Sequence, residues 1–374
     1  MIYKDFKGKQ LSALGLGCMR LPQLDSYENV DMDALKVLVD RALVGGVNYF
    51  DTAWGYHGGN SETAMGQVLS AYPRDSYFLA SKFPCFERDK LLHVREIFEK
   101  QLEKCQTEYF DFYLIHNLSE HNVDDVLDPQ YGILEYLLEQ KRLGRIRHFG
   151  FSTHGSLETV TRFLDAWGEH MEFCQIQLNW LDWTLQNARL KVELLNRRGI
   201  PVWVMEPVRG GSLCKLDPAY EEKLRALCPQ RSVPEWGFRF LQGIPGVTMI
   251  LSGMSNLEQL DANVATFSED APLDNHENTA LLEIARAMTS CGTLPCTGCR
   301  YCTPHCPQGL NIPWLIEIYN GHKYAGHPLS AKSVSAVDES SRPTACVGCR
   351  ACEEVCPQNI RISEMMAEFA ENIR

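Results

Sequence analysis

Short apolar runs alternate along most of the chain with longer stretches in which apolar residues recur at helical spacing. The runs predict eight β-strands, at residues 11–17, 48–52, 78–82, 110–116, 148–152, 173–177, 201–205 and 248–252. The longer stretches predict helices at residues 32–43, 62–71, 92–105, 133–143, 157–167, 185–198, 220–227 with 234–241, and 257–266. Because helices separate the strands, the strands are expected to run parallel.

Eight strand–helix units predict an α/β protein with a closed (β/α)8 TIM barrel. An open doubly wound sheet is the alternative. Such a sheet commonly carries a Gly-x-Gly-x-x-Gly turn after its first strand, and this chain has none there. The pattern therefore favours the barrel.

The distribution of cysteines indicates a second domain. Of 15 cysteines in 374 residues, eight fall between Cys296 and Cys356. We expect the barrel over residues 1–270, a connecting segment over 271–290 with a helix at 275–289, and a small, mainly helical domain over 291–374. Within this last domain, helices are predicted at 311–320 and 362–373 and a loop at 321–342.

The charge and hydropathy of the chain argue against nucleic acid and membranes as its main partners. A net charge of −12 argues against nucleic acid and anionic membrane surfaces, which attract basic proteins. No apolar run approaches the ~18 residues of a membrane span, and the first residues lack the apolar segment of a signal peptide. We expect a cytoplasmic protein whose clustered cysteines bind metal rather than form disulfides.

Polar side chains end three successive predicted strands. Asp51, Lys82 and His116 close the second, third and fourth, and Tyr56 follows Asp51 by five residues. Taken singly, these residues resemble a helix cap, a solvated lysine and a core histidine. The carboxyl ends of barrel strands meet at one mouth, however, so together they favour a shared catalytic site.

The four side chains suit the protonation of a carbonyl group. Tyrosine, with a pKa near 10, is a poor acid at neutral pH unless a nearby ammonium stabilises its phenolate. Lys82 would supply that charge, Asp51 would hold Lys82 charged and oriented, and His116 could direct an N–H at the carbonyl oxygen. None of these groups can supply a hydride, so the chemistry needs a cofactor.

Three segments carry a family resemblance: Asp51-Thr52-Ala53-Trp54-Gly55-Tyr56, Ser81-Lys82 and Leu114-Ile115-His116. In order, spacing and strand placement they resemble the aldo-keto reductases, over roughly residues 1–265. The resemblance implies a barrel reductase that uses a nicotinamide cofactor, most often NADPH, on aldehydes and ketones. By this likeness Tyr56 is the general acid, Asp51 and Lys82 tune it, and His116 orients the substrate.

The same resemblance implies the cofactor contacts Ser152, Gln175, Met205, Gly253, Ser255, Gln259 and Asn263. Ser152 and Gln175 match positions that hold the nicotinamide carboxamide, and Met205 stands where an aromatic ring often stacks. The other four match the loop and helix that bind the adenosine phosphate. Gly253 and Gln259 replace a lysine and an arginine of many members, and Thr153 replaces an asparagine, so NADP(H) is implied with NAD(H) as the alternative.

The clustered cysteines repeat one spacing, Cys-x2-Cys-x2-Cys-x3-Cys-Pro, in the sets Cys296, Cys299, Cys302, Cys306 and Cys346, Cys349, Cys352, Cys356. Bacterial ferredoxins bind [4Fe–4S] clusters with this run. Structural zinc, the alternative, uses two separated Cys-x2-Cys pairs and would leave a surplus cysteine. The spacing therefore predicts two [4Fe–4S] clusters.

The region resembles two-cluster ferredoxin modules, and its long spacer resembles the helical ferredoxin domains of respiratory enzymes. A crossed ligand pattern is implied, with Cys356 joining the first three cysteines and Cys306 joining Cys346, Cys349 and Cys352. We thus expect an NAD(P)H-dependent reductase of a small carbonyl compound, with an electron-transfer or redox-sensing module and a redox partner protein there. The alternatives are an electron carrier whose barrel mainly docks partners, and a reductase with purely structural clusters.

Overall fold

The computed structural model describes residues 1–290, 292–325, 334 and 338–372. The chain packs into two compact units. The first comprises Met1–Pro207 and Pro234–Leu273, and the second comprises Val208–Val233 and Asp274–Arg374. Residues 208–233, expected within the barrel domain, group with the second unit.

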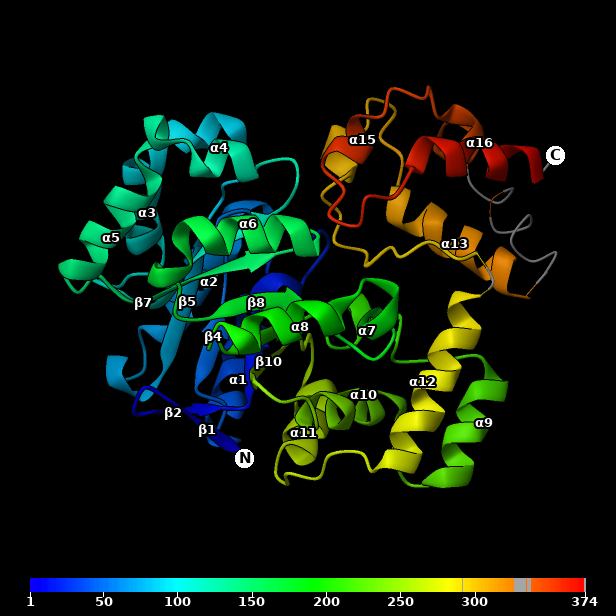
Figure 1. Ribbon diagram of the computed structural model, residues 1–374, viewed down its shortest axis with the longest axis horizontal. Helices are drawn as coiled ribbons and strands as arrows, with labels where there is room; N and C mark the ends of the chain where they lie inside the picture. The colour runs from blue at the N-terminus through cyan, green and yellow to red at the C-terminus, as the bar shows by residue number, and fades with distance from the viewer. Residues whose placement is uncertain (291, 326–333, 335–337, 373–374) are drawn as a thin grey trace. The chain divides into compact units, whose positions relative to one another are not determined.

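The first unit is a closed barrel of eight parallel strands surrounded by helices (Figure 1). Its strands are β3 (Leu14–Gly17), β4 (Tyr49–Asp51), β5 (Phe78–Phe83), β6 (Phe110–Leu118), β7 (Ile146–Thr153), β8 (Cys174–Gln177), β9 (Val202–Met205) and β10 (Val247–Ser252). They follow one another around the barrel in chain order, and β10 closes it against β3. The predicted TIM barrel is confirmed.

A hairpin precedes the barrel. Strands β1 (Tyr3–Phe6) and β2 (Lys9–Ser12) pair antiparallel across a two-residue turn. Both turn residues, Lys7 and Gly8, have positive φ, 51° and 80°, as in the tight turns that match strand twist. The prediction of one strand at 11–17 was therefore wrong, because its first residues belong to β2 and its last to β3.

Alternate side chains of the strands fill the barrel interior. The interior cluster comprises Phe6, Leu11, Tyr49, Ala80, Phe112, Leu114, Phe173, Trp203, Met249 and Leu251. The hairpin contributes Phe6, whose ring centroid lies 5.1 Å from that of Trp203 and 5.6 Å from that of Phe112. The hairpin thus closes the amino-terminal end of the barrel.

The helices of the first unit are α1 (Met32–Val44), α2 (Asn60–Leu69), α3 (Val94–Lys104), α4 (Val123–Leu127), α5 (Ile133–Arg142), α6 (Leu157–Trp167), α7 (Asp182–Leu185), α8 (Ala188–Arg197), α10 (Val233–Gln242) and α11 (Leu257–Thr266). Asp31, Ser156 and Asn256 cap α1, α6 and α11 by accepting a backbone N–H. The predicted helix at 185–198 was wrong at its start, because Asn187 has a φ of 51° and separates α7 from α8.

The second unit is helical and contains no strand among its described residues. Its helices are α9 (Pro218–Leu227), α12 (Asn275–Thr289), α13 (Ile312–Ala325), α15 (Ala351–Glu354) and α16 (Ile362–Asn372). Side chains of α13 and α16 form its core, where the rings of Tyr319 and Phe369 lie 5.7 Å apart. The loop predicted at 321–342 was wrong at its start, since α13 continues to Ala325. Residues 326–333, 335–337 and 373 lie outside the described residues.

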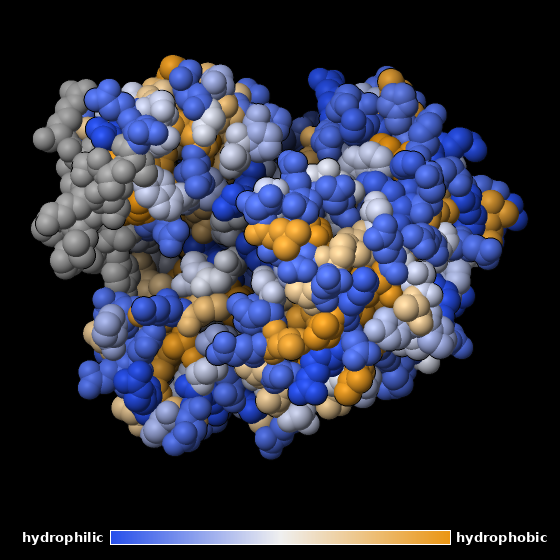
Figure 2. Space-filling model, turned by 180° about the vertical axis from the view of Figure 1, so that it is seen from behind, coloured by the Kyte–Doolittle hydropathy of each residue, from blue (hydrophilic) through white to orange (hydrophobic). Residues whose placement is uncertain are grey.

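The surface is mainly hydrophilic on the face that Figure 2 shows, with hydrophobic residues in small groups. Exposed large hydrophobic side chains include Leu24, Val44, Leu92 and Val347, which lie far apart in the sequence. Among the described helices, none combines the length and hydropathy needed to cross a membrane.

Replacing Phe6 with alanine should destabilise the barrel by about 3–5 kcal/mol, because it opens a cavity in the closed end of the core. Urea unfolding followed by circular dichroism measures this change. The control is Lys9→Ala on the same hairpin, an exposed position, which should change stability by no more than about 0.5 kcal/mol. Equal effects of the two substitutions would mean that the hairpin does not close the core.

Candidate functional site

The barrel brings the four predicted catalytic residues together. Asp51 on β4, Lys82 on β5 and His116 on β6 each lie two positions beyond a member of the interior cluster. Because alternate residues of a strand face the same side, these three side chains continue the interior column to the carboxyl end. Tyr56 begins the short 3-10 turn Tyr56–Gly59 that follows β4.

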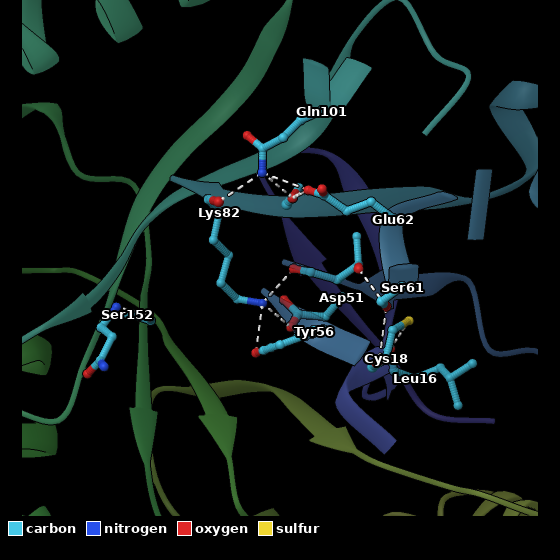
Figure 3. A network of polar contacts seen from close by, with 12 residues as sticks. Leu16, Cys18, Asp51, Tyr56, Ser61, Glu62, Lys82, Gln101 and Ser152 are labelled. Atoms are coloured by element: carbon cyan, nitrogen blue, oxygen red, sulfur yellow. Dashed lines mark hydrogen bonds and ion pairs between the residues drawn. The ribbon is translucent and has the colours of Figure 1, made fainter. Parts of the chain in front are cut away.

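The Lys82 ammonium lies at the centre of this group (Figure 3). Its Nζ is 2.5 Å from Asp51 Oδ1, 2.7 Å from the Thr52 carbonyl oxygen and 3.4 Å from the Tyr56 hydroxyl oxygen. The His116 ring stands edge-on to the Tyr56 ring, with centroids 5.8 Å apart. A cation, a carboxylate, a phenol and an imidazole therefore share one mouth.

Burial sets the electrostatics of this group. Lys82 is 0% exposed and Asp51 2% exposed. Burial raises the pKa of Asp51, and the Lys82 ammonium opposes that rise. Burial, reinforced by the charge of Lys82, holds the pKa of His116 well below its ordinary value. His116 is therefore a neutral imidazole at pH 7, able to donate one hydrogen bond.

His57 fixes the turn that carries Tyr56, a role that the sequence did not reveal. Its Nδ1–H donates to the Tyr27 carbonyl oxygen at 2.5 Å, and its Nε2 accepts the Leu21 backbone N–H at 3.1 Å. Its ring also stacks on Tyr27. These partners lie 30 or more positions earlier in the chain, and the only local signal was adjacency to Tyr56.

A buried hydrogen-bond network supports the backbone of Lys82 (Figure 3). Gln101 on α3 donates from Nε2 to the Lys82 carbonyl oxygen at 2.9 Å and to Glu62 Oε1 at 2.7 Å. The Tyr113 hydroxyl donates to Gln101 Oε1 at 2.5 Å, and Lys104 pairs with Glu62 at 3.1 Å. The network fixes the position from which the Lys82 side chain enters the mouth.

The residues expected at the nicotinamide lie on the next three strands. Ser152 is on β7, Gln175 on β8, and Met205 ends β9. Gln175 Oε1 is buried and lacks a hydrogen-bond partner among the described residues, as does the side-chain oxygen of Asn117. Asn117 donates its backbone N–H to Ser152 Oγ at 2.9 Å. Unsatisfied buried acceptors are costly, so a bound amide would find partners here.

The residues expected at the adenosine phosphate gather at the amino end of α11. Gly253 and Ser255 lie between β10 and this helix, and the Ser255 N–H donates to Gln259 Oε1 at 2.8 Å. Asn263 Nδ2 donates to the Ser252 hydroxyl at 3.1 Å. The Gln259 and Asn263 side chains therefore shape the loop, and neither carries a positive charge.

Four cysteines in the second unit line one small cavity of about 20 Å³. They are Cys306, from the first copy of the repeat, and Cys346, Cys349 and Cys352, from the second. Four thiols around one cavity are the donor set of a [4Fe–4S] cluster. No three His, Cys, Asp or Glu side chains in the described part of the chain converge tightly enough to hold a single metal ion.

Cys356, the last cysteine of the second copy, lies near the first copy. Burial, together with the charges of Cys296 and Cys356, raises the pKa of Cys299 to about 12. Burial and the nearby Cys299, Cys296 and Cys356 thiols raise the pKa of Cys302 as well. Cys356 therefore lies close enough to Cys299 and Cys302 to affect their ionisation.

Comparison with models of known protein families identifies a match for each of the two regions of the chain. The model of the "Aldo/keto reductase family" matches residues 13–286. The chain belongs to the aldo/keto reductase family. The model of a "4Fe-4S dicluster domain" matches residues 295–360. The resemblance noted from the sequence is thus confirmed for both regions, and the protein is an oxidoreductase of this family.

Related proteins cover most of this aldo/keto reductase. L-galactose dehydrogenase of Arabidopsis thaliana is 24% identical over 75% of this chain and 94% of its own. The NADH-specific methylglyoxal reductase of Escherichia coli is 26% identical over 74% of this chain and 96% of its own. A probable aldo-keto reductase of Glycine max is 28% identical, and the match spans 58% of that protein. The holo form of an aldo-keto reductase from Bacillus halodurans, 25% identical, superposes with a TM-score of 0.61 over 74% of this chain and 93% of its own.

Stability should fall as the pH is lowered from 7 to 5. Burial lowers the pKa values of His57 and His116, and lowers that of His154 to about 3. The unfolded chain, with histidine pKa values near 6.5, then binds more protons than the folded chain, and each such histidine contributes up to about 1.4 kcal/mol per pH unit. Urea unfolding of the holoprotein across this range measures the slope.

A histidine substitution tests the origin of this slope. His154→Gln should reduce it, whereas His93→Gln, at an exposed position, should leave it unchanged. Stability that is independent of pH between 7 and 5 would contradict the assignment of three neutral histidines.

Proposed function

We propose that the barrel reduces the carbonyl group of a small aldehyde or ketone with a hydride from NADP(H), with NAD(H) as the alternative cofactor. The buried Lys82 ammonium, held between Asp51 and the Tyr56 hydroxyl beside a neutral His116, is the observation that carries this proposal. A carbonyl oxygen that gains electron density needs a proton and a hydrogen-bond donor, and this group offers both.

Each residue has one task in this reaction. The nicotinamide, when bound, supplies a hydride to the carbonyl carbon. Tyr56 donates its hydroxyl proton to the carbonyl oxygen, and the Lys82 ammonium, 3.4 Å away, stabilises the phenolate that remains. His116 donates an N–H to the same oxygen and fixes its direction. Asp51 keeps Lys82 charged and oriented.

The unsatisfied amide groups support a nicotinamide site. Gln175, Ser152 and Asn117 would hold the carboxamide, since two of these side chains carry buried oxygens with no partner among the described residues. Asn117 would take the place of the family's asparagine, because the Thr153 hydroxyl donates to a backbone carbonyl instead. Met205 would pack on the ring. A Klebsiella pneumoniae aldo-keto reductase solved with NADPH shares the fold, at 21% identity and a TM-score of 0.59.

In the domain over residues 291–374 the eight cysteines would hold two [4Fe–4S] clusters in the crossed pattern. One set is Cys296, Cys299, Cys302 and Cys356, and the other is Cys306, Cys346, Cys349 and Cys352. The cavity that the second set lines supports this assignment. The clusters supply one-electron chemistry when bound.

The fifteen cysteines, with no disulfide among the described residues, fit a cytoplasmic protein.

We assign the clusters to electron transfer or redox sensing with a partner protein. The exposed Cys349 supports this role, because it brings one ligand set to the surface of its unit. A purely structural role is the second candidate, favoured by Cys302, Cys352 and Cys356 lying within the small core of that unit. The four converging catalytic side chains weigh against a barrel that only docks partners.

Replacing Tyr56 with phenylalanine should lower carbonyl reduction by about 10² or more, the scale of general acid catalysis. Cofactor affinity should stay within about twofold, since the hydroxyl acts on the substrate. Reduction of a panel of aldehydes and ketones and titration of cofactor fluorescence measure the two effects. Tyr72→Phe, which removes a hydroxyl bonded to Asp40, is the control and should retain activity. Normal turnover by Tyr56→Phe would rule out its role as the acid.

Protein prepared without oxygen should contain about eight iron and eight sulfide ions per chain. Two structural zinc ions would instead give two metals and no sulfide. Elemental and sulfide analysis separates these outcomes.

Cysteine variants test the crossed ligand pattern. Under this pattern the electron paramagnetic resonance spectrum of Cys306→Ser should match that of Cys349→Ser, and Cys356→Ser should match Cys299→Ser. The control Cys228→Ser, outside both sets, should resemble the unmodified protein. A match between Cys306→Ser and Cys299→Ser would show that each repeat binds its own cluster.

A further inference from the structure

Arg20 lies against the loop that follows β10, although it comes from the segment between β3 and α1. Its Cβ, Cγ and Cδ atoms are 3.1–3.3 Å from the position that a Cβ at residue 253 would occupy. Its carbonyl oxygen accepts the Ser255 hydroxyl at 2.8 Å. The Arg20 side chain therefore occupies the space that a side chain at Gly253 would need.

The Arg20 guanidinium is held only loosely. Its Nη2 is 3.7 Å from Glu206 Oε1, too far for a hydrogen bond, and the side chain is 33% exposed. Glu206 follows β9, with a φ of 57°, and its carbonyl oxygen accepts Asn179 Nδ2 at 3.0 Å. Arg20 Nη2 is buried and has no hydrogen-bond partner among the described residues. An unsatisfied buried donor is costly, so Arg20 can exchange this distant carboxylate for an anion that accepts a hydrogen bond from it.

Neither residue 253 nor residue 259, where many members of the family carry a lysine and an arginine, supplies a cation beside Arg20. Gly253 has no side chain, and the Gln259 amide oxygen accepts the Ser255 N–H. A guanidinium binds phosphate through paired, charge-assisted hydrogen bonds, which neither residue can provide.

We propose that Arg20 binds the 2′-phosphate of the cofactor and makes this enzyme prefer NADPH to NADH. The proposal rests on the dinucleotide site proposed above. On binding, the guanidinium leaves Glu206 and pairs with the phosphate at the amino end of α11, where the positive end of the helix dipole adds to the attraction. Arg20 thereby supplies, from another strand end, the charge that residues 253 and 259 do not carry.

Calorimetric titration of the holoprotein with NADPH, NADH and 2′,5′-ADP tests this assignment. Arg20→Met keeps the aliphatic stem over Gly253 and removes the charge. It should weaken the binding of NADPH and 2′,5′-ADP by about tenfold or more, as expected for loss of a charged hydrogen bond. NADH affinity should change by less than about twofold, and Arg20→Lys should recover part of the NADPH affinity.

Arg41→Met is the matched control, because Arg41 on α1 is exposed and pairs at 2.8 Å with Asp261 of α11, the helix at the proposed phosphate site. It should leave all three affinities unchanged. Equal weakening of NADPH and NADH by Arg20→Met would overturn the assignment, because Arg20 would then contact a group that both cofactors share. Unchanged affinities would overturn it as well. Failure of the unmodified protein to bind either dinucleotide would instead contradict the proposed function.

Discussion

A lysine ammonium and a carboxylate, both withdrawn from water, govern the mouth of this barrel. Lys82 and Asp51 each offset the cost of burying the other, and removing one partner of such a pair typically costs about 3–5 kcal/mol. The pair also affects the groups nearby, since Lys82 lies 3.4 Å from the Tyr56 hydroxyl, and burial together with the Lys82 charge lowers the pKa of His116. Barrel closure makes the arrangement possible, because β4, β5 and β6 present their interior residues at one end.

Much of this arrangement could be predicted from the sequence. Strand positions follow from short apolar runs, and the alternation of side chains carries Asp51, Lys82 and His116 to the same end of the barrel. The paired cysteine spacing likewise indicates a cluster domain without any knowledge of its fold.

Contacts between distant segments could not be predicted in this way. The hairpin around the Lys7-Gly8 turn was not predicted from the sequence. Only the fold shows that Phe6 packs into the end of the barrel. His57 and Arg20 act through partners far away in the chain, which no local pattern identifies. Asp51, Lys82 and His116 were visible because they close predicted strands, whereas His57 and Arg20 carry no such signal.

The two regions of the chain differ in the chemistry that they support. A hydride carries two electrons, whereas an iron–sulfur cluster passes one at a time, so exchange between them requires a carrier able to do both. Cys349, one of the four cysteines that line a common cavity, is exposed on the surface of its unit. The four proposed catalytic side chains all belong to the first unit.

The central claim is that the Lys82 ammonium makes Tyr56 an effective acid. The pH dependence of carbonyl reduction in the unmodified protein and in Lys82→Met tests it most directly. The account predicts that the rate of the unmodified protein falls at high pH as Tyr56 loses its proton. In Lys82→Met the rate should drop by about 10² or more, and the remaining fall should move to higher pH. An unchanged pH profile in Lys82→Met would contradict the account.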